Sequence, residues 1–110
     1  MTGPRFRTGQ VVTVFRSRLR PGVGDAYGEL AAELLAAASA HPGFVDFAHF
    51  VSDDDEHVST VTFDSWSSHH AWREDALHRA AQRRGRDEFY AEYSIQVGEV
   101  STAHGWHLDG

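Results

Sequence analysis

The pattern of hydrophobic and polar positions along the chain predicts four strands. Residues 10–19 are rich in β-branched side chains and alternate in their second half, as half-buried strands do. Three further segments have the same character, namely 44–51, 57–63 and 90–100. The acidic turn 52–56 separates the second segment from the third, so these two are expected to pair as an antiparallel hairpin.

The same pattern predicts two helical regions. The first covers residues 24–40, where one stripe at three- and four-residue spacing contains Tyr27, Leu30, Ala31, Leu34, Leu35 and Ala38. The second begins at Ser67 or Ser68, either of which could cap its first turn, and runs to Gly85. Asp75 marks a point at which this second region is expected to bend or divide.

The resulting order, strand-helix-strand-strand-helix-strand, is that of the α+β ferredoxin-like fold, βαββαβ. It predicts a four-stranded antiparallel sheet with helices on one face. The opposite face would be uncovered and would carry Val, Phe and Thr side chains, so we expect a homodimer that packs sheet against sheet. The domain is expected over residues 10–101, between an N-terminal lead-in, 1–9, and a C-terminal tail, 102–110.

Composition narrows the chemistry that a chain of 110 residues can perform. The chain has no Cys, and all ten of its basic residues are Arg. Thiolate nucleophiles, disulfides, iron-sulfur clusters, Schiff-base lysines and Walker-type phosphate loops are therefore excluded. The net charge of −6 argues against a nucleic-acid partner. No apolar run is long enough for a membrane span and no signal core begins the chain, so a cytoplasmic location is expected.

A dedicated metal site is not predicted. The acidic turn 52–56 lacks the Gly and the distal Glu of an EF-hand loop, which favours a solvated turn. Of the eight His residues, His49, His70 and His78 could form a facial triad only if the tertiary structure assembled one.

The densest candidate chemistry lies in residues 62–82. Trp66 follows the third predicted strand, Trp72 lies within the second helical region, and His78 and Gln82 have the four-residue spacing that places both on one helix face. Two indoles, an imidazole and an amide could converge on a cavity between sheet and helix. The alternative is that each is a packing residue, because buried Trp and a single His on an apolar face usually belong to the core.

These segments resemble the antibiotic biosynthesis monooxygenase family of dimeric α/β-barrel proteins. The resemblance covers residues 11–100 and rests on VVTVFRSRLRPG at 11–22, the Pro-Gly-Phe turn at 42–44, FDSWSSHHAW at 63–72 and the run from WREDALH to YSIQV at 72–97. The family includes oxygenases of aromatic polyketides that need no cofactor, and heme-degrading monooxygenases.

The oxygenase branch implies a monooxygenase that oxidises a polycyclic phenol or anthrone with O₂ and without a cofactor. Its members have a Trp at the position of Trp66, an aromatic residue at that of Trp72 and an Asn where this chain has Thr62. In this interpretation His78 is the base and the two Trp residues hold a planar substrate. The substrate's oxygens would be oriented by Gln82, Arg73 and Tyr90, and Thr62 and Phe15 are expected to be further substrate-binding residues.

The heme-degrading branch implies heme as the alternative cofactor. Its strand-one Asn falls at Phe15 and its heme-ligating His at Gln82, while His78, one turn earlier, could take the place of that His. A third hypothesis is a dimer that binds or cyclises a small aromatic ligand without oxidising it. The sequence leaves open whether His104, Trp106 and His107 of the tail fold over the site.

Overall fold

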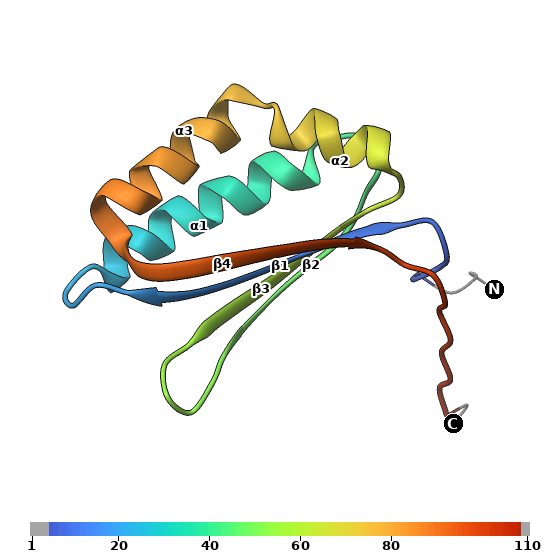
Figure 1. Ribbon diagram of the computed structural model, residues 1–110, viewed down its shortest axis with the longest axis horizontal. Helices are drawn as coiled ribbons and strands as arrows, with labels where there is room; N and C mark the ends of the chain where they lie inside the picture. The colour runs from blue at the N-terminus through green and yellow to red at the C-terminus, as the bar shows by residue number, and fades with distance from the viewer. Residues whose placement is uncertain (1–4, 109–110) are drawn as a thin grey trace.

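The computed structural model describes residues 5–108, and these form one antiparallel sheet whose helices all lie on one face (Figure 1). The elements are β1 (Val11–Leu19), α1 (Gly24–Ser39), β2 (Phe44–Val51), β3 (His57–Phe63), α2 (Trp66–Arg73), α3 (Ala76–Arg84), a π-helical turn (Gly85–Phe89) and β4 (Tyr90–Glu99). The predicted ferredoxin-like α+β fold is confirmed. Parts of the lead-in 1–9 and of the tail 102–110, namely residues 1–4 and 109–110, lie outside the described residues.

The strand order β2-β3-β1-β4 places β1 and β3 in the centre of the sheet. Phe15 of β1 is in register with Ser59 of β3 on one side and with Ile95 of β4 on the other. Because side chains alternate between the two faces of a strand, these three residues share the face that the helices cover. The sheet register therefore decides which polar residues face the helices.

The second helical region divides at Glu74 and Asp75, as predicted, into α2 and α3. The prediction that Ser67 or Ser68 caps it was wrong, because Ser65 is the N-cap. Ser65 has extended backbone, with φ −159° and ψ 167°, and its Oγ accepts a hydrogen bond from the Ser68 amide. The helix thus begins at Trp66, directly after the cap, and this fixes the direction in which that indole leaves the helix.

The second helical region also does not end at Gly85 as predicted. The chain continues from α3 through the π-helical turn directly into β4. Gly85 is buried, and a Cβ atom at this position would overlap the ring of Tyr90. Glycine is therefore required here by the close approach of an aromatic ring. Gly43 has φ +85° and approaches Asp64 and Ser68, so the turn before β2 has the same requirement.

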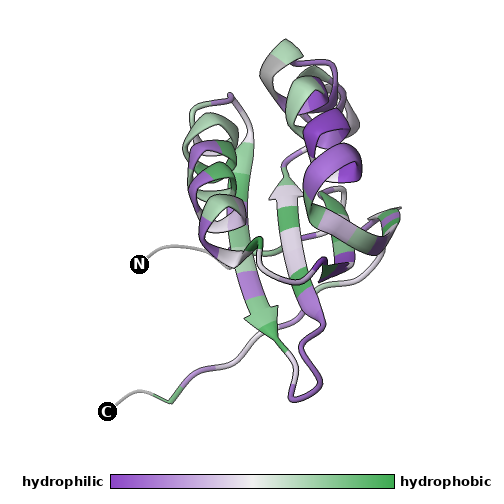
Figure 2. Cartoon of the chain, turned by 90° about the vertical axis from the view of Figure 1, so that its left-hand side faces the viewer, coloured by the Kyte–Doolittle hydropathy of each residue, from purple (hydrophilic) through white to green (hydrophobic). Residues whose placement is uncertain are grey.

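Two small apolar clusters join the helices to the sheet. One contains Ala38, Val61, Phe63 and Trp72, and the other contains Leu30, Ala81 and Phe89. Figure 2 shows the helices and the sheet as two layers, with a hydrophilic tip on the β2–β3 hairpin. The first cluster packs the last turn of α1 and α2 on β3, and the second packs the middle of α1 against α3 and the π-helical turn. Members of both clusters line the cavity described below.

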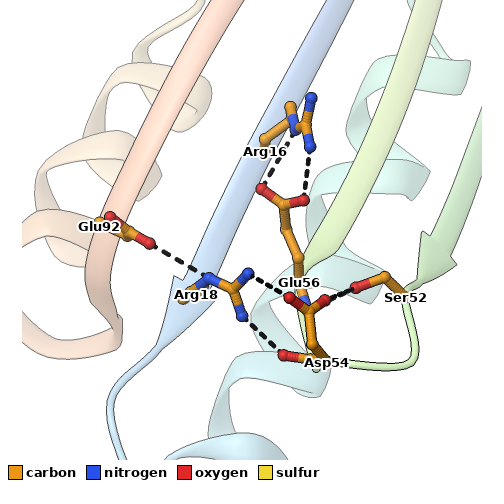
Figure 3. A network of polar contacts seen from close by, with 6 residues as sticks. All are labelled: Arg16, Arg18, Ser52, Asp54, Glu56 and Glu92. Atoms are coloured by element: carbon orange, nitrogen blue, oxygen red, sulfur yellow. Dashed lines mark hydrogen bonds and ion pairs between the residues drawn. The ribbon is translucent and has the colours of Figure 1, made fainter.

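The carboxylates of the hairpin tip form ion pairs with arginines of β1 (Figure 3). Glu56 accepts two hydrogen bonds from Arg16, at 2.6 and 3.1 Å, and Asp54 accepts one from Arg18 at 2.9 Å. Arg18 also lies 3.2 Å from Glu92 of β4. Arg16 and Arg18 alternate with cavity-facing residues, so the network lies on the face opposite the helices and ties the hairpin tip to the sheet.

No helix of the part of the chain that the structure describes covers that opposite face of the sheet (Figure 1). Phe50 is 62% exposed there. The homodimer that would cover this face stays a prediction. Within residues 5–108, no helix combines the length and the apolar character needed to cross a bilayer.

Candidate functional site

A cavity of about 490 Å³ lies between the sheet and the helices. Its floor is the inner face of all four strands, and its roof comes from α1, the end of α2 and α3. The volume is in the range of small-molecule sites, and most of the lining is aliphatic or aromatic. Among residues 5–108, Arg73 is the one arginine that lines it, and no Asp or Glu does.

At the helix end of the cavity, His78 packs against Trp72. The ring centroids of the two residues are 4.3 Å apart, and Trp72 in turn stacks on the fully buried Phe63 at 5.2 Å. Phe63 of β3 thus packs against the indole of Trp72 from the sheet, and His78 of α3 packs against it from the helix layer. In the sequence, the signal for this contact was that both residues fall in the second helical region, one on each side of the break expected at Asp75.

Burial lowers the pKa of His78 to about 4, with a further contribution from the positive charge of Arg73. Asp75 acts in the opposite direction. The imidazole is therefore neutral near pH 7, with a nitrogen that can accept a proton. A charged histidine at this place would be unable to act as a base.

The structure brings most of the predicted site residues to this cavity. Those that line it are Phe15, Trp72, Arg73, His78, Gln82 and Tyr90. They come from β1, α2, α3 and the start of β4, so only the folded chain assembles them.

Trp66 and Thr62 are not among the residues that line the cavity. Trp66 is 41% exposed, and its Nε1 donates a hydrogen bond to Glu99 at 2.8 Å. The buried ring of His69 lies between Trp66 and Trp72, with centroid distances of 5.6 and 5.9 Å. Thr62 alternates with Val61 and Phe63, which face the helices, so its side chain belongs to the other face of the sheet. The two indoles therefore do not converge.

A second group of polar residues lines the cavity from the sheet, and the sequence reasoning did not identify it. His49 Nε2 lies 3.1 Å from Nδ1 of His57, and His49 Nδ1 lies 2.8 Å from Oγ of Ser59. The signal was present in the period of two along β3, which places His57, Ser59 and Val61 on one face. The register of β2 then brings His49 beside them.

An aromatic wall made of Phe15 and three tyrosines completes the cavity near this second group. Tyr90 lies 5.7 Å from Tyr27 and 5.6 Å from Tyr93, and Phe15 stacks on Tyr93 at 5.6 Å. Burial raises the pKa of Tyr90 well above its ordinary value, and the neighbouring Tyr27 raises it further. Tyr90 is therefore a protonated phenol at physiological pH and can donate a hydrogen bond.

Two hydroxyl groups on the cavity side of β1 are buried without a hydrogen-bond partner among the described residues, Thr13 Oγ1 and Ser17 Oγ. Thr13 lines the cavity. A buried hydroxyl without a partner costs stability, so a ligand oxygen placed beside Thr13 would gain a hydrogen bond that the protein alone does not make.

The described residues contain no group of three His, Cys, Asp or Glu side chains arranged to hold a metal ion. The triad of His49, His70 and His78 is accordingly not assembled. His70 is exposed and packs beside Trp66, outside the cavity, while the other two line it. The site's chemistry therefore rests on imidazoles, phenols, one amide and one guanidinium.

Comparisons with known proteins identify a family and a fold. The model of the antibiotic biosynthesis monooxygenase family matches residues 10–84. The uncharacterised protein YqjZ of Bacillus subtilis is 30% identical over 74 residues, which is 67% of this chain and 65% of that protein. The match therefore spans slightly less than two thirds of that relative's length.

Solved structures share the fold at low sequence identity. Protein SO0527 of Shewanella oneidensis has a TM-score of 0.77 at 14% identity, over 87% of this chain and 95% of its own. SnoaB, a cofactor-independent oxygenase from Streptomyces nogalater, has a TM-score of 0.74 at 12% identity, over 86% and 95%. A protein of Nitrosomonas europaea described as a putative antibiotic biosynthesis monooxygenase has a TM-score of 0.74 at 16% identity, over 86% and 93%.

Proposed function

Since this chain belongs to the antibiotic biosynthesis monooxygenase family, we propose that it is a cofactor-independent monooxygenase that oxidises a polycyclic phenol or anthrone with O₂. The observation that carries the proposal is the buried imidazole of His78, which packs at a tilt against Trp72 in an apolar cavity of about 490 Å³ and whose pKa is lowered by that burial. SnoaB, whose fold is similar, is a cofactor-independent oxygenase.

The reaction begins with transfer of a proton from the substrate to His78. An anthrone loses a proton from its CH₂ group and becomes an electron-rich anion, which passes one electron to O₂. Radical recombination forms a C–O bond, and the resulting peroxide anion takes back the proton from the imidazolium. Loss of water then breaks the O–O bond and the second C–H bond. The net change converts CH₂ and O₂ into C=O and H₂O, so atoms and electrons balance.

The low pKa of His78 suits this sequence because the proton is held only briefly. In the empty cavity burial disfavours the imidazolium. When the substrate anion forms beside it, the attraction between the two charges in a low-dielectric cavity offsets that cost. His78 then returns the proton to the peroxide.

The remaining cavity residues position the substrate in this proposal. Trp72 and Phe15 contact the flat face of a ring system. Hydrogen bonds to the oxygen on which negative charge develops come from Gln82, Tyr90 and Arg73, and such donors are a main source of rate enhancement for anionic intermediates.

Oxygen uptake by purified, chelator-treated protein tests the proposal. Anthrone and 1,4-dihydroxynaphthalene are suitable substrates, and the rate above the uncatalysed autoxidation is measured. We expect saturable O₂ consumption and formation of the quinone. Tight binding of these compounds without any O₂ uptake would instead support the non-oxidative ligand-binding hypothesis.

A second candidate function is heme binding, and the same imidazole favours it. His78 lines an aromatic cavity with its pKa lowered by burial, so its neutral imidazole would be the residue to hold the iron of a heme. Trp72 would pack on the porphyrin, and Arg73 would pair with a propionate. Bound heme would supply the activation of O₂. Titration with hemin tests this candidate: a stoichiometric Soret shift that is lost in His78→Gln supports it, and the absence of saturable binding removes it.

A further inference from the structure

The pair formed by His49 and His57 leaves a single ring nitrogen for a ligand. Three of its four ring nitrogens have partners, because His49 bonds to His57 through Nε2 and to Ser59 through Nδ1. The fourth, Nε2 of His57, makes no hydrogen bond to any of residues 5–108. His57 is half-buried and lines the cavity.

The hydrogen-bonded chain allows this nitrogen to carry a proton. When Ser59 donates to Nδ1 of His49, Nε2 of His49 carries the proton and donates to Nδ1 of His57. Nε2 of His57 then carries the proton of that neutral ring and can donate it to a ligand. Tyr27 packs edge-on against His57 at 5.9 Å and so fixes the ring from α1.

The charge of the lining indicates which ligand group would meet this donor. The chain has a net charge of −6, yet the cavity is lined by no Asp or Glu and contains Arg73 together with three histidines. Two carboxylates of the turn before His57, Asp54 and Glu56, are held on the opposite face by Arg18 and Arg16. An acidic ligand in the cavity therefore meets lining residues that offer hydrogen-bond donors and no negative charge.

We propose that His57, supported by His49 and Ser59, is a second anchor in the cavity and binds an acidic oxygen of the substrate, a carboxylate or a phenolate. This inference rests on the proposed function in taking an aromatic substrate, and it adds that the substrate has a second, acidic point of attachment on β3. His57 and Val61 both line the cavity and are four residues apart on β3, so the cavity extends about 13 Å along this strand. Val61 packs with Trp72, the neighbour of His78.

Equilibrium binding of two matched probes tests the proposal under anaerobic conditions. Anthracene-2-carboxylate presents an acidic oxygen, and its primary alcohol, 2-(hydroxymethyl)anthracene, presents a neutral one. We expect the wild-type protein to bind the carboxylate more tightly. His57→Phe keeps a ring against Tyr27 and removes both nitrogens, so carboxylate affinity should fall by about tenfold to a hundredfold, the range typical of a lost charge-assisted hydrogen bond.

The alcohol serves as the control for folding. It makes no charge-assisted hydrogen bond, so its affinity should change less than about twofold in His57→Phe. His104→Phe, a matched change in the exposed tail, should alter neither affinity. His57→Gln, which keeps a neutral donor, should fall between the wild type and His57→Phe.

Two results would overturn the inference: unchanged carboxylate affinity in His57→Phe, or an equal loss for both probes. Because the measurement excludes O₂, it is independent of turnover. Expected binding without oxygen uptake would refute the monooxygenase proposal alone, and oxygen uptake with no selectivity for the carboxylate would refute the anchor alone.

Discussion

The cavity contains histidines in two different settings. At the helix end, His78 packs at a tilt against Trp72 with ring centroids 4.3 Å apart, and burial lowers its pKa to about 4. At the sheet end, His49 and His57 are hydrogen bonded to each other, and His49 is exposed enough to meet solvent. The pKa of His49 is also lowered, by burial and by the neighbouring imidazole of His57.

This difference teaches that one residue type can provide two functions within one cavity. An isolated imidazole against an indole has a neutral nitrogen and apolar surroundings, which suit it to accept a proton from a substrate. A pair of imidazoles linked to a serine can share a proton along hydrogen bonds, which suits it to hold an anion. The predictions below test whether the two ends really differ in this way.

The largest expected effect is on catalysis at the helix end. His78→Gln removes the proposed base and should lower kcat/KM for oxygen uptake about 10²- to 10⁴-fold, the usual contribution of general base catalysis. His104→Gln, in the exposed tail, should retain full activity. Equal activity of the two variants would contradict the assignment of His78.

The variant Trp66→Phe is measured in the same oxygen-uptake assay. Because its Nε1 bonds to Glu99 outside the cavity, the activity of this variant should fall less than about tenfold, within the energy of one surface hydrogen bond. A loss as large as that of His78→Gln would show that Trp66 is catalytic, as the family resemblance implies.

The comparison of Trp66 with Trp72 also shows what the sequence could predict and what it could not. Strand boundaries agree with the structure within about a residue because alternation and Gly or Pro turns fix them locally. The direction of the Trp66 side chain depends instead on the cap at Ser65, two residues before the first predicted cap. His57 was missed because the face of β3 that turns toward the helices is set by its pairing with β1, which is distant in sequence.

The next effect is on folding of the helix end. Phe63 is fully buried and supports Trp72 from β3, so Phe63→Ala should lower the free energy of unfolding by about 3–5 kcal/mol. Chemical denaturation measures this loss. In the folded fraction, binding of the anthracene probes should weaken for both compounds alike, unlike the selective loss expected at His57.

A smaller effect follows from the pKa of His78. The folded protein holds this group at about 4, while the unfolded chain titrates near 6.5. Its contribution to stability is complete above pH 6.5 and is lost as the pH falls toward 4, because the unfolded state binds the proton first. The loss should be about 2 kcal/mol, which is less than the full difference in pKa would give because the ring is partly exposed to solvent. The slope of stability between pH 6.5 and 4 should be flatter in His78→Gln, and an unchanged slope would contradict the stated burial.

The smallest effect concerns the β2–β3 hairpin, which contains His49 and His57 of the sheet end of the cavity. Arg16 lowers the pKa of Glu56, so their pairing stabilises the protein above the ordinary carboxyl pKa and is lost as the pH falls through the lowered value. Arg16→Gln should therefore lower the melting temperature slightly at pH 7, and the difference should vanish in high salt because the pair is exposed.

The same variant separates the two ends of the cavity. His57 follows Glu56 directly in the chain, so loosening the hairpin should weaken binding of anthracene-2-carboxylate at low salt and leave kcat for anthrone, which depends on His78, unchanged. A parallel decrease in both would mean that the hairpin and the helix end respond as one unit. The two imidazole sites would then lack the independence that their separate contacts predict.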